Sequence, residues 1–341
     1  MKILFISHRF YPEIGGIETN AEILASGFCN LGADVHLVTW TKAKNGKQFP
    51  FTVIRNPGIK QLLKEHRWAD VILENNPSLR LSWPNLFLKK PLVIALNTWV
   101  TRLNGEKGFR DKLKYAWFKR AKKMIAVSDA VRKREWPEAV VIENPYNNDL
   151  FLINPAINKI IPFVFLGRLV SDKGADQAIR AVAALVEEHV LSSNFTQLTI
   201  IGEGPERKKL EVLVKELKLN KVVNFVGAMR GKDLANCLNH HQYILVPSSW
   251  EEPYGNVVLE AMACGCIPVA SNGGGLPEAV GKAGFLFKRN DTDEMINLLK
   301  KIFKNELKTD AVKNESADHL KEHSMEKVSR AYLNILMSAV K

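Results

Sequence analysis

The sequence predicts an α/β protein built from two doubly wound domains. Its 341 residues exceed the ~250–300 at which a single hydrophobic core usually stops growing. In both halves, short apolar segments alternate with amphipathic ones, as parallel strands alternate with the helices that connect them. Prolines and asparagines cluster in residues 143–162, where proline would interrupt either regular structure. We therefore expect one domain over residues 1–155 and a second over residues 156–320.

The first half contains five segments with the character of buried strands. They are KILFISH, DVHLVTW, ADVILEN, PLVIALN and KMIAVSD. A helix is expected between the first two, after the turn Gly15-Gly16 and ending at Gly32. This alternation predicts a parallel sheet with helices on both faces.

The second half repeats the alternation and ends in a different way. Its expected strands are FVFLGRL, QLTIIG, VVNFVG, YILVPS and IPVAS. Residues 318–340 read as one amphipathic helix with no strand after it. We therefore treat residues 321–341 as a separate terminal segment, which is free to leave the second sheet and to pack elsewhere.

Composition narrows the class of protein. Apolar residues at 46% and charged residues at 25% are ordinary for a globular chain. The apolar run after Lys2 is too short for a signal peptide, and no run of ~18 apolar residues occurs, so we expect a cytoplasmic protein. The four cysteines have no zinc-like spacing, and we expect neither a metal nor a cofactor.

The net charge of +12 is concentrated in the first half. Residues 102–134 carry 12 basic and three acidic side chains. Within them, GFRDKLKYAWFKRAKKM interleaves aromatic residues with cations, which is typical of a helix that lies on an anionic membrane. Residues 107–123 are thus a candidate peripheral membrane contact. Two alternatives stay open: a surface helix whose Leu and Trp enter the core, or a cationic face that attracts an anionic acceptor glycan.

Two cations follow the first strand of the second half. Arg168 and Lys173 lie five residues apart in the turn GRLVSDKG. Ligands of open α/β sheets bind beyond the carboxyl ends of strands, and fixed cations there can neutralise a diphosphate leaving group. The alternative for either residue is that it is an ordinary solvated charge on the surface.

Glycine turns follow two other strands. Gly15 and Gly16 come after KILFISH, and Gly202 and Gly204 come after QLTII, with Pro205 expected at the first position of a helix. These glycines would let the backbone approach a phosphate or a sugar. Taken alone, they are equally explained as good turn chemistry.

The segment from Pro247 to Glu278 carries the clearest chemical signal. Its loop SWEEPYG brings Glu252 to the start of a helix, and Glu260 lies about one turn inside that helix among apolar neighbours. Carboxylates accept hydrogen bonds from sugar hydroxyls, so one can hold a sugar and the other a ribose, with pyrophosphate between them at the helix N-terminus. A carboxylate among apolar residues is either buried with a partner or part of a site.

The order GGIE, GRLVSDKG, IIGEGPE and PSSWEEPYGNVVLEAMACGCIPVASNGGGLPE resembles the family 4 retaining glycosyltransferases of the GT-B fold. The resemblance implies two Rossmann-like domains that face each other across a cleft and a C-terminal helix that crosses back to the first domain. It implies a diphosphate contact from Gly16, a ribose contact from Glu260, and a sugar contact from Glu252 with the backbone of Tyr254, Gly255 and Asn256. Gly15, Gly202 and Gly204 are further candidates for donor contact. Glu252, Arg168 and Lys173 are the expected catalytic residues, the last two on the diphosphate.

The function implied by the resemblance is retaining transfer of a sugar from a nucleotide sugar, with a UDP-sugar favoured. The acceptor implied is a lipopolysaccharide, capsule or O-antigen glycan. A GT-B-fold sugar-nucleotide epimerase is the alternative enzyme. A nucleic-acid binder is less favoured, because the basic charge is not accompanied by a recognisable nucleic-acid module.

One position departs from the family pattern. The family usually has a histidine where PLVIALNTWV has Asn97. The amide of Asn97 can hydrogen-bond to the acceptor substrate or to the donor sugar, but it cannot titrate as a histidine does. We therefore expect Asn97 to contact the acceptor or the sugar, with a donor preference that the sequence does not define.

Overall fold

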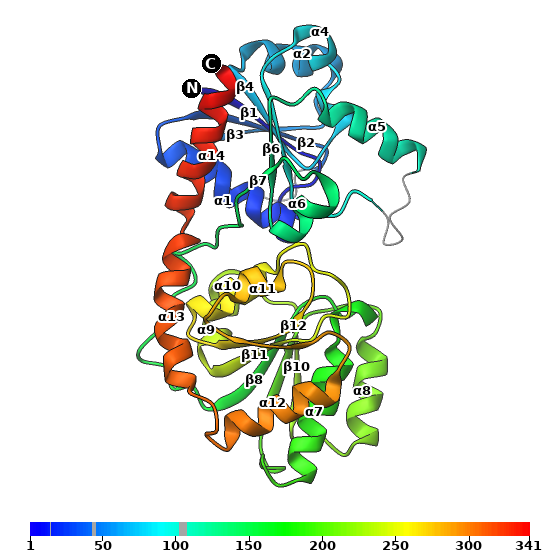
Figure 1. Ribbon diagram of the computed structural model, residues 1–341, viewed down its shortest axis with the longest axis vertical. Helices are drawn as coiled ribbons and strands as arrows, with labels where there is room; N and C mark the ends of the chain where they lie inside the picture. Colours follow the sequence, from blue (N-terminus) through cyan, green and yellow to red (C-terminus); the bar gives the residue numbers. More distant parts are fainter. Residues whose placement is uncertain (14, 43–45, 102–107) are drawn as a thin grey trace. The chain divides into compact units, whose positions relative to one another are not determined.

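A computed structural model describes residues 1–13, 15–42, 46–101 and 108–341, and it divides into two compact units. Unit 1 comprises Met1–Tyr146 and His323–Lys341, and unit 2 comprises Asn147–Glu322 (Figure 1). The sequence-based boundary at 155/156 lies later than this division. Residues 147–155 are attached to unit 2, because Phe151 is buried and the amide of Asn239 exchanges hydrogen bonds of 2.8 and 3.0 Å with the backbone of Asn154 and Leu152.

Unit 1 is built on a seven-stranded parallel sheet with the order β3-β2-β1-β4-β5-β6-β7. Its strands are β1 (Lys2–Ser7), β2 (Asp34–Thr39), β3 (Thr52–Arg55), β4 (Val71–Asn75), β5 (Leu92–Leu96), β6 (Lys123–Ala126) and β7 (Val140–Val141). Its helices are α1 (Gly16–Asn30), α2 (Ile59–Trp68), α3 (Leu79–Ser82), α4 (Asn85–Leu88), α5 (Phe109–Phe118), α6 (Asp129–Glu135) and α14 (Met325–Val340).

Unit 2 is built on a six-stranded parallel sheet with the order β10-β9-β8-β11-β12-β13. Its strands are β8 (Ile161–Leu166), β9 (Leu198–Ile201), β10 (Val223–Gly227), β11 (His241–Val246), β12 (Ile267–Asn272) and β13 (Phe285–Lys288). Its helices are η1 (Ser171–Lys173), α7 (Ala175–Glu187), α8 (Arg207–Glu216), α9 (Gly231–Asn239), α10 (Asn256–Ala263), α11 (Leu276–Val280), α12 (Thr292–Phe303) and α13 (Thr309–Glu322). Helices α7, α8 and α12 lie on one face, and α9, α10 and α11 lie on the other (Figure 1).

The two doubly wound parallel sheets confirm the predicted fold class. In each sheet the strand order reverses beside the first strand, between β1 and β4 and between β8 and β11. Such a reversal is where ligands of doubly wound proteins bind, beyond the carboxyl ends of the strands. In unit 2 this point lies between the exits of β8 and β11, which lead to Gly167 and Pro247.

The C-terminal segment forms two helices rather than the single helix expected over 318–340. Helix α13 ends at Glu322, and α14 begins after Ser324, whose hydroxyl caps it by accepting a hydrogen bond from the backbone N–H of Lys327 at 3.4 Å. In unit 1, α14 lies beside α1, with the rings of Tyr332 and Phe28 6.3 Å apart (Figure 1). Among the described residues, no helix is both long and apolar enough to cross a membrane.

Candidate active site

The exit of β8 leads into a tight turn that carries both predicted cations. Arg168 is exposed directly after Gly167, and Lys173 ends the short helix η1. Gly174 follows with a φ of 75°, and a Cβ there would lie 2.0 Å from the carbonyl oxygen of Pro247. Only glycine therefore allows this turn to pack against the exit of β11.

Lys173 and Glu252 form an ion pair at this point, with 19% and 12% of their side chains exposed. The hydroxyl of Ser248, which is buried, lies 2.9 Å from Oε1 of Glu252. The Lys173 ammonium also lies 5.4 Å from the centre of the Trp250 ring, within the range of a cation–π interaction. The structure thus brings together Lys173 and Glu252, two of the three predicted catalytic residues, which come from loops 79 residues apart in sequence.

The carbonyl oxygen of Asp172 joins the two loops. It accepts hydrogen bonds from the backbone N–H groups of Ser249 at 3.0 Å and Trp250 at 3.3 Å, and it lies 2.9 Å from the Ser248 hydroxyl. Ser248 and Trp250 were not predicted from the sequence as site residues. Their position directly after an apolar strand that precedes a predicted site is the signal that could have identified them.

A third loop fixes the backbone of Glu252. The N–H of Gly275 donates to the Glu252 carbonyl at 2.7 Å. The neighbouring Gly274 has a φ of 59°, and a Cβ there would lie 2.1 Å from the same carbonyl. The glycine run before Leu276 therefore sets the position of the Glu252 loop.

Helix α10 begins directly after this loop, at Asn256. Gly255 precedes it with a φ of 122°, and a Cβ there would meet Leu276 at 2.6 Å. The side chain of Tyr254 is buried, so it is the backbone of this residue that the turn can present to a ligand. A helix N-terminus with such a glycine is suited to an anion.

Glu260 lies in α10 and is partly buried beside Leu259 and Ala261, which are fully buried. Burial raises the pKa of its carboxyl group to about 7. Within the described part of the chain its carboxylate has no hydrogen-bond partner. A carboxyl group that lacks an internal partner at this depth can accept hydrogen bonds from a hydroxyl-bearing ligand.

The glycine turn after β9 has a packing role. A Cβ on Gly202 would lie 1.8 Å from the carbonyl oxygen of Gly167, and one on Gly204 would lie 2.2 Å from that of Leu169. The turn therefore has to be glycine in order to lie against the exit of β8. Pro205 was expected from the sequence at the first position of a helix, but α8 begins two residues later, at Arg207.

In unit 1, Asn97 belongs to a buried group of amides at the exits of β4 and β5. Its Nδ2 donates to Oδ1 of Asn75 at 2.6 Å, and its Oδ1 accepts from Nδ2 of Asn20 at 3.2 Å. Only 7% of Asn97 is exposed.

The turn Gly15-Gly16 lies at the start of α1, the helix that also contains Asn20. Gly15 has a φ of 173°, which is extended backbone that any residue can adopt.

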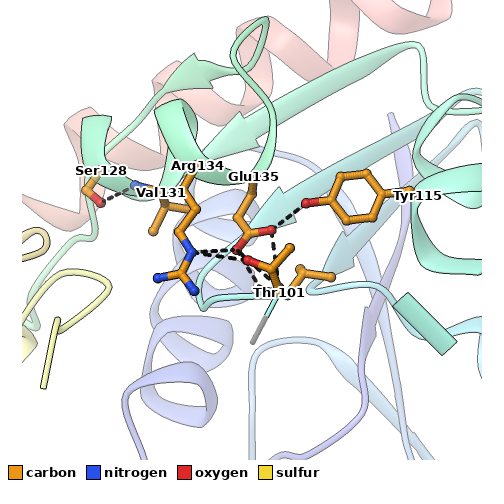
Figure 2. A network of polar contacts seen from close by, with 7 residues as sticks. Thr101, Tyr115, Ser128, Val131, Arg134 and Glu135 are labelled. Carbon is orange, nitrogen blue, oxygen red and sulfur yellow. Dashed lines mark hydrogen bonds and ion pairs between the residues drawn. The ribbon is translucent and has the colours of Figure 1, made fainter. Parts of the chain in front are cut away.

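Helix α5 uses most of its aromatic residues inside unit 1. Trp117 is 4% exposed and donates from Nε1 to the buried Glu74 at 2.9 Å, and Phe118 is also buried. Tyr115 donates to Glu135 at 2.6 Å, and the same carboxylate accepts from Thr101 (Figure 2). Burial raises the pKa of Glu74. The predicted range 107–123 begins outside the described residues. Within them Trp117 enters the core, as the surface-helix alternative expected, whereas Leu113, which that alternative also placed in the core, is 45% exposed.

The two doubly wound parallel sheets place the protein in the class of GT-B folds. The family model described as glycosyl transferases group 1 matches residues 154–322. Over 157 residues the chain is 34% identical to D-inositol 3-phosphate glycosyltransferase of Corynebacterium jeikeium, which covers 43% of this chain and 36% of that relative. The alignment therefore spans about a third of that relative's length.

Two solved structures match over nearly the whole chain. Anabaena HepE, solved with UDP and glucose, has a TM-score of 0.80 at 20% identity and covers 99% of this chain and 100% of its own. WaaG, a glycosyltransferase of lipopolysaccharide biosynthesis, has a TM-score of 0.69 at 19% identity and covers 98% and 99%. The matched half of the chain belongs to the glycosyl transferases group 1 and is GT4-like, and the two units have the GT-B fold.

Proposed function

We propose that the protein transfers a sugar from a nucleotide sugar, most favourably a UDP-sugar, to a hydroxyl group of a glycan or lipid-linked acceptor, with retention of configuration. The juxtaposition of Lys173 and Glu252 carries this proposal. A cation suited to a diphosphate and a carboxylate suited to sugar hydroxyls lie side by side at the switch point of unit 2. HepE, which has the same fold, binds UDP and glucose.

The proposed chemistry needs a stabilised leaving group more than it needs a protein nucleophile. As the bond between the anomeric carbon and the diphosphate oxygen breaks, negative charge develops on that oxygen. Lys173, with Arg168 and the N-terminus of α10, would stabilise this charge. Glu252 would hold the sugar hydroxyls and Glu260 the ribose hydroxyls, so the two carboxylates have separate roles.

Transfer is tested by incubating the purified protein with UDP-glucose, with UDP-galactose, and with an acceptor extract from bacterial envelopes. UDP release that depends on the extract, with an α-linked product seen by NMR, is expected. Glu252→Ala should remove most turnover, because it removes the carboxylate that orients the sugar. Near-normal turnover would contradict this role, and UDP release without any acceptor would favour the epimerase alternative.

An acceptor in a bacterial surface glycan, such as lipopolysaccharide, capsule or O-antigen, is the second part of the proposal. WaaG acts in lipopolysaccharide biosynthesis. Such acceptors are often attached to lipid, so we also propose a peripheral position on the inner face of the cytoplasmic membrane. A pair of exposed apolar residues in α4 supports this: Phe87 is 74% exposed and Leu86 is 45% exposed.

Basic residues surround that pair. The guanidinium of Arg120, after α5, lies 3.4 Å from the carbonyl oxygen of Leu86, and the exposed Lys89 lies two residues after Phe87. Lys119 and Lys122 are exposed on the same stretch as Arg120. Exposed apolar side chains within a cationic surface are suited to an anionic bilayer. The apolar contact would then come mainly from α4, and α5 would supply charge together with Leu113, which is 45% exposed.

Vesicle co-sedimentation tests the membrane position. We expect binding to vesicles that contain phosphatidylglycerol and weaker binding to vesicles of phosphatidylcholine alone. Phe87→Ser should reduce binding, whereas Phe195→Ser, a change at a 56%-exposed residue of unit 2, should leave it unchanged. Equal loss in both variants, or no binding to the anionic vesicles at low salt, would refute the membrane position and leave the transfer reaction untouched.

A further inference from the structure

Lys173 and Glu252 neutralise each other's charge. The ammonium and the carboxylate form an ion pair, and both side chains are largely buried. Under the proposed function each of them also has a partner in the donor, since the diphosphate takes the cation and the sugar hydroxyls take the carboxylate. Donor binding therefore exchanges one internal ion pair for two contacts with the ligand.

The surroundings of the pair make this exchange possible without loss of position. The Trp250 ring lies 5.4 Å from the Lys173 ammonium, and this contact does not depend on the Glu252 carboxylate. On the other side, the Ser248 hydroxyl lies 2.9 Å from the Glu252 carboxylate, and Gly275 fixes the Glu252 backbone at 2.7 Å. Each charged group thus keeps a second contact after the pair separates.

The nucleoside diphosphate that remains after transfer cannot replace the ion pair in the same way as the nucleotide sugar. A nucleoside diphosphate has no sugar hydroxyls to offer Glu252. Its terminal phosphate also carries up to one more negative charge than the diester in the nucleotide sugar, because a phosphate monoester loses a second proton near pH 6. If Lys173 moves to this phosphate, the Glu252 carboxylate stays partly buried beside a like charge. Among the described residues its remaining donor is the Ser248 hydroxyl, which also lies 2.9 Å from the Asp172 carbonyl oxygen.

We propose that Glu252 has a second role, which is to favour release of the nucleoside diphosphate. This inference rests on the proposed function. After transfer, the carboxylate loses its sugar partner and competes with the diphosphate for Lys173. The ion pair re-forms as the product leaves. The same residue that orients the donor sugar therefore weakens the complex with the product.

The test compares the affinities of diphosphates and nucleotide sugars for the wild type and for Glu252→Gln by calorimetric titration. UDP, GDP and ADP are titrated first, and the one that binds the wild type best is paired with its glucose conjugate. Glutamine keeps the size of the side chain and removes its charge, so Lys173 becomes available to the diphosphate. We expect the variant to bind the diphosphate about fivefold more tightly and the glucose conjugate no more tightly than the wild type.

Glu251→Gln is the matched control. It removes the same charge from the adjacent residue, whose carboxylate pairs with Arg289 at 3.1 Å instead of with Lys173. We expect its affinity for the diphosphate to stay within about twofold of the wild type. Ligand-free melting curves of both variants verify that each is folded.

The outcomes separate the inference from the function beneath it. Unchanged or weaker diphosphate binding by Glu252→Gln overturns the product-release role, and so does equal tightening in Glu251→Gln. If the wild type binds GDP or ADP better than UDP, only the proposal of a UDP-sugar donor is contradicted. The product-release role is then tested with the diphosphate that binds best. Absence of binding by all three diphosphates overturns both.

Discussion

Tyr115 donates its phenolic hydroxyl to Oε2 of Glu135 at 2.6 Å, while the Thr101 hydroxyl donates to Oε1 at 2.7 Å (Figure 2). The Glu135 side chain is fully buried and also accepts from the backbone N–H of Val100 at 3.1 Å. One carboxylate therefore connects α5, α6 and the segment after β5. Burial and the neighbouring carboxylate raise the pKa of Tyr115, so its hydroxyl stays protonated and remains a donor.

Removing that hydroxyl should destabilise the fold. Tyr115→Phe leaves the buried Glu135 carboxylate with one donor fewer, and we expect the free energy of unfolding to fall by about 1–3 kcal/mol in urea titrations. Tyr146→Phe is the control, because the hydroxyl of Tyr146 has no hydrogen-bond partner in the described part of the chain. Equal effects of the two changes would mean that the contact with Glu135 adds nothing.

Gly274 should not tolerate a side chain. At a φ of 59°, Gly274→Ala combines backbone strain with a contact of 2.1 Å to the Glu252 carbonyl. Gly32 has a φ of 84° and open space around its Cβ position, so Gly32→Ala carries the strain without the clash. We expect Gly32→Ala to cost about 1 kcal/mol and Gly274→Ala clearly more, with loss of transferase activity in the latter only. Similar melting temperatures for the two variants would contradict this account of the loop.

Glu260 should make stability depend on pH. Burial raises its pKa from 4.5 to about 7, so between these values the folded protein holds a proton that the unfolded chain has released. Its contribution to the free energy of unfolding therefore falls as pH rises from 4.5 to about 7 and is constant above. Glu260→Gln should remove this slope, measured by urea unfolding at several pH values. A slope identical to that of the wild type would assign it to other groups.

The same carboxyl group should couple donor binding to pH. If ribose hydroxyls donate to Glu260, they favour its ionised form, so binding releases a proton below a pH of about 7. UDP-glucose suits the measurement because its phosphates are diesters that do not titrate in this range. We expect its affinity to rise from pH 6 to pH 8 in the wild type and to be flat in Glu260→Gln. Equal pH dependence in both proteins would exclude Glu260 as the hydroxyl acceptor.

The sequence revealed the elements that are buried on both faces. Strands such as β1 and β11 are nearly continuous apolar runs, because helices cover both sides of a parallel sheet. The missed strands β3, β7 and β13 lie at the edges of their sheets and are partly exposed, so they lack such runs. The break between α13 and α14 was missed because a capping serine hardly alters an amphipathic pattern.

For the candidate site, residue types were easier to predict than contacts. The sequence places Lys173 and Glu252 after two strands, but their ion pair depends on Gly174 and Gly274, which let three loops approach closely. Trp250 was missed because a single aromatic residue in a loop has no periodic pattern, and its position shortly after the strand YILVPS was the one signal in the sequence. The aromatic residues of α5 have the composition of an interfacial helix, and only their burial reveals that Trp117 belongs to the core.

Asn97 is the position where the family pattern and the structure can be tested against each other. Its side chain joins Asn75 and Asn20 through hydrogen bonds of 2.6 and 3.2 Å in a nearly closed environment. Asn97→Ala leaves both neighbours short of a partner, and we expect a loss of about 1–3 kcal/mol in the free energy of unfolding. Asn30→Ala, at an exposed residue of α1, is the control and should have little effect.

Asn97→His restores the residue usual in the family. If Asn97 contacts the sugar, this variant should change the ratio of kcat/KM for UDP-glucose and UDP-galactose. If Asn97 serves only the amide cluster, stability falls and the ratio stays constant.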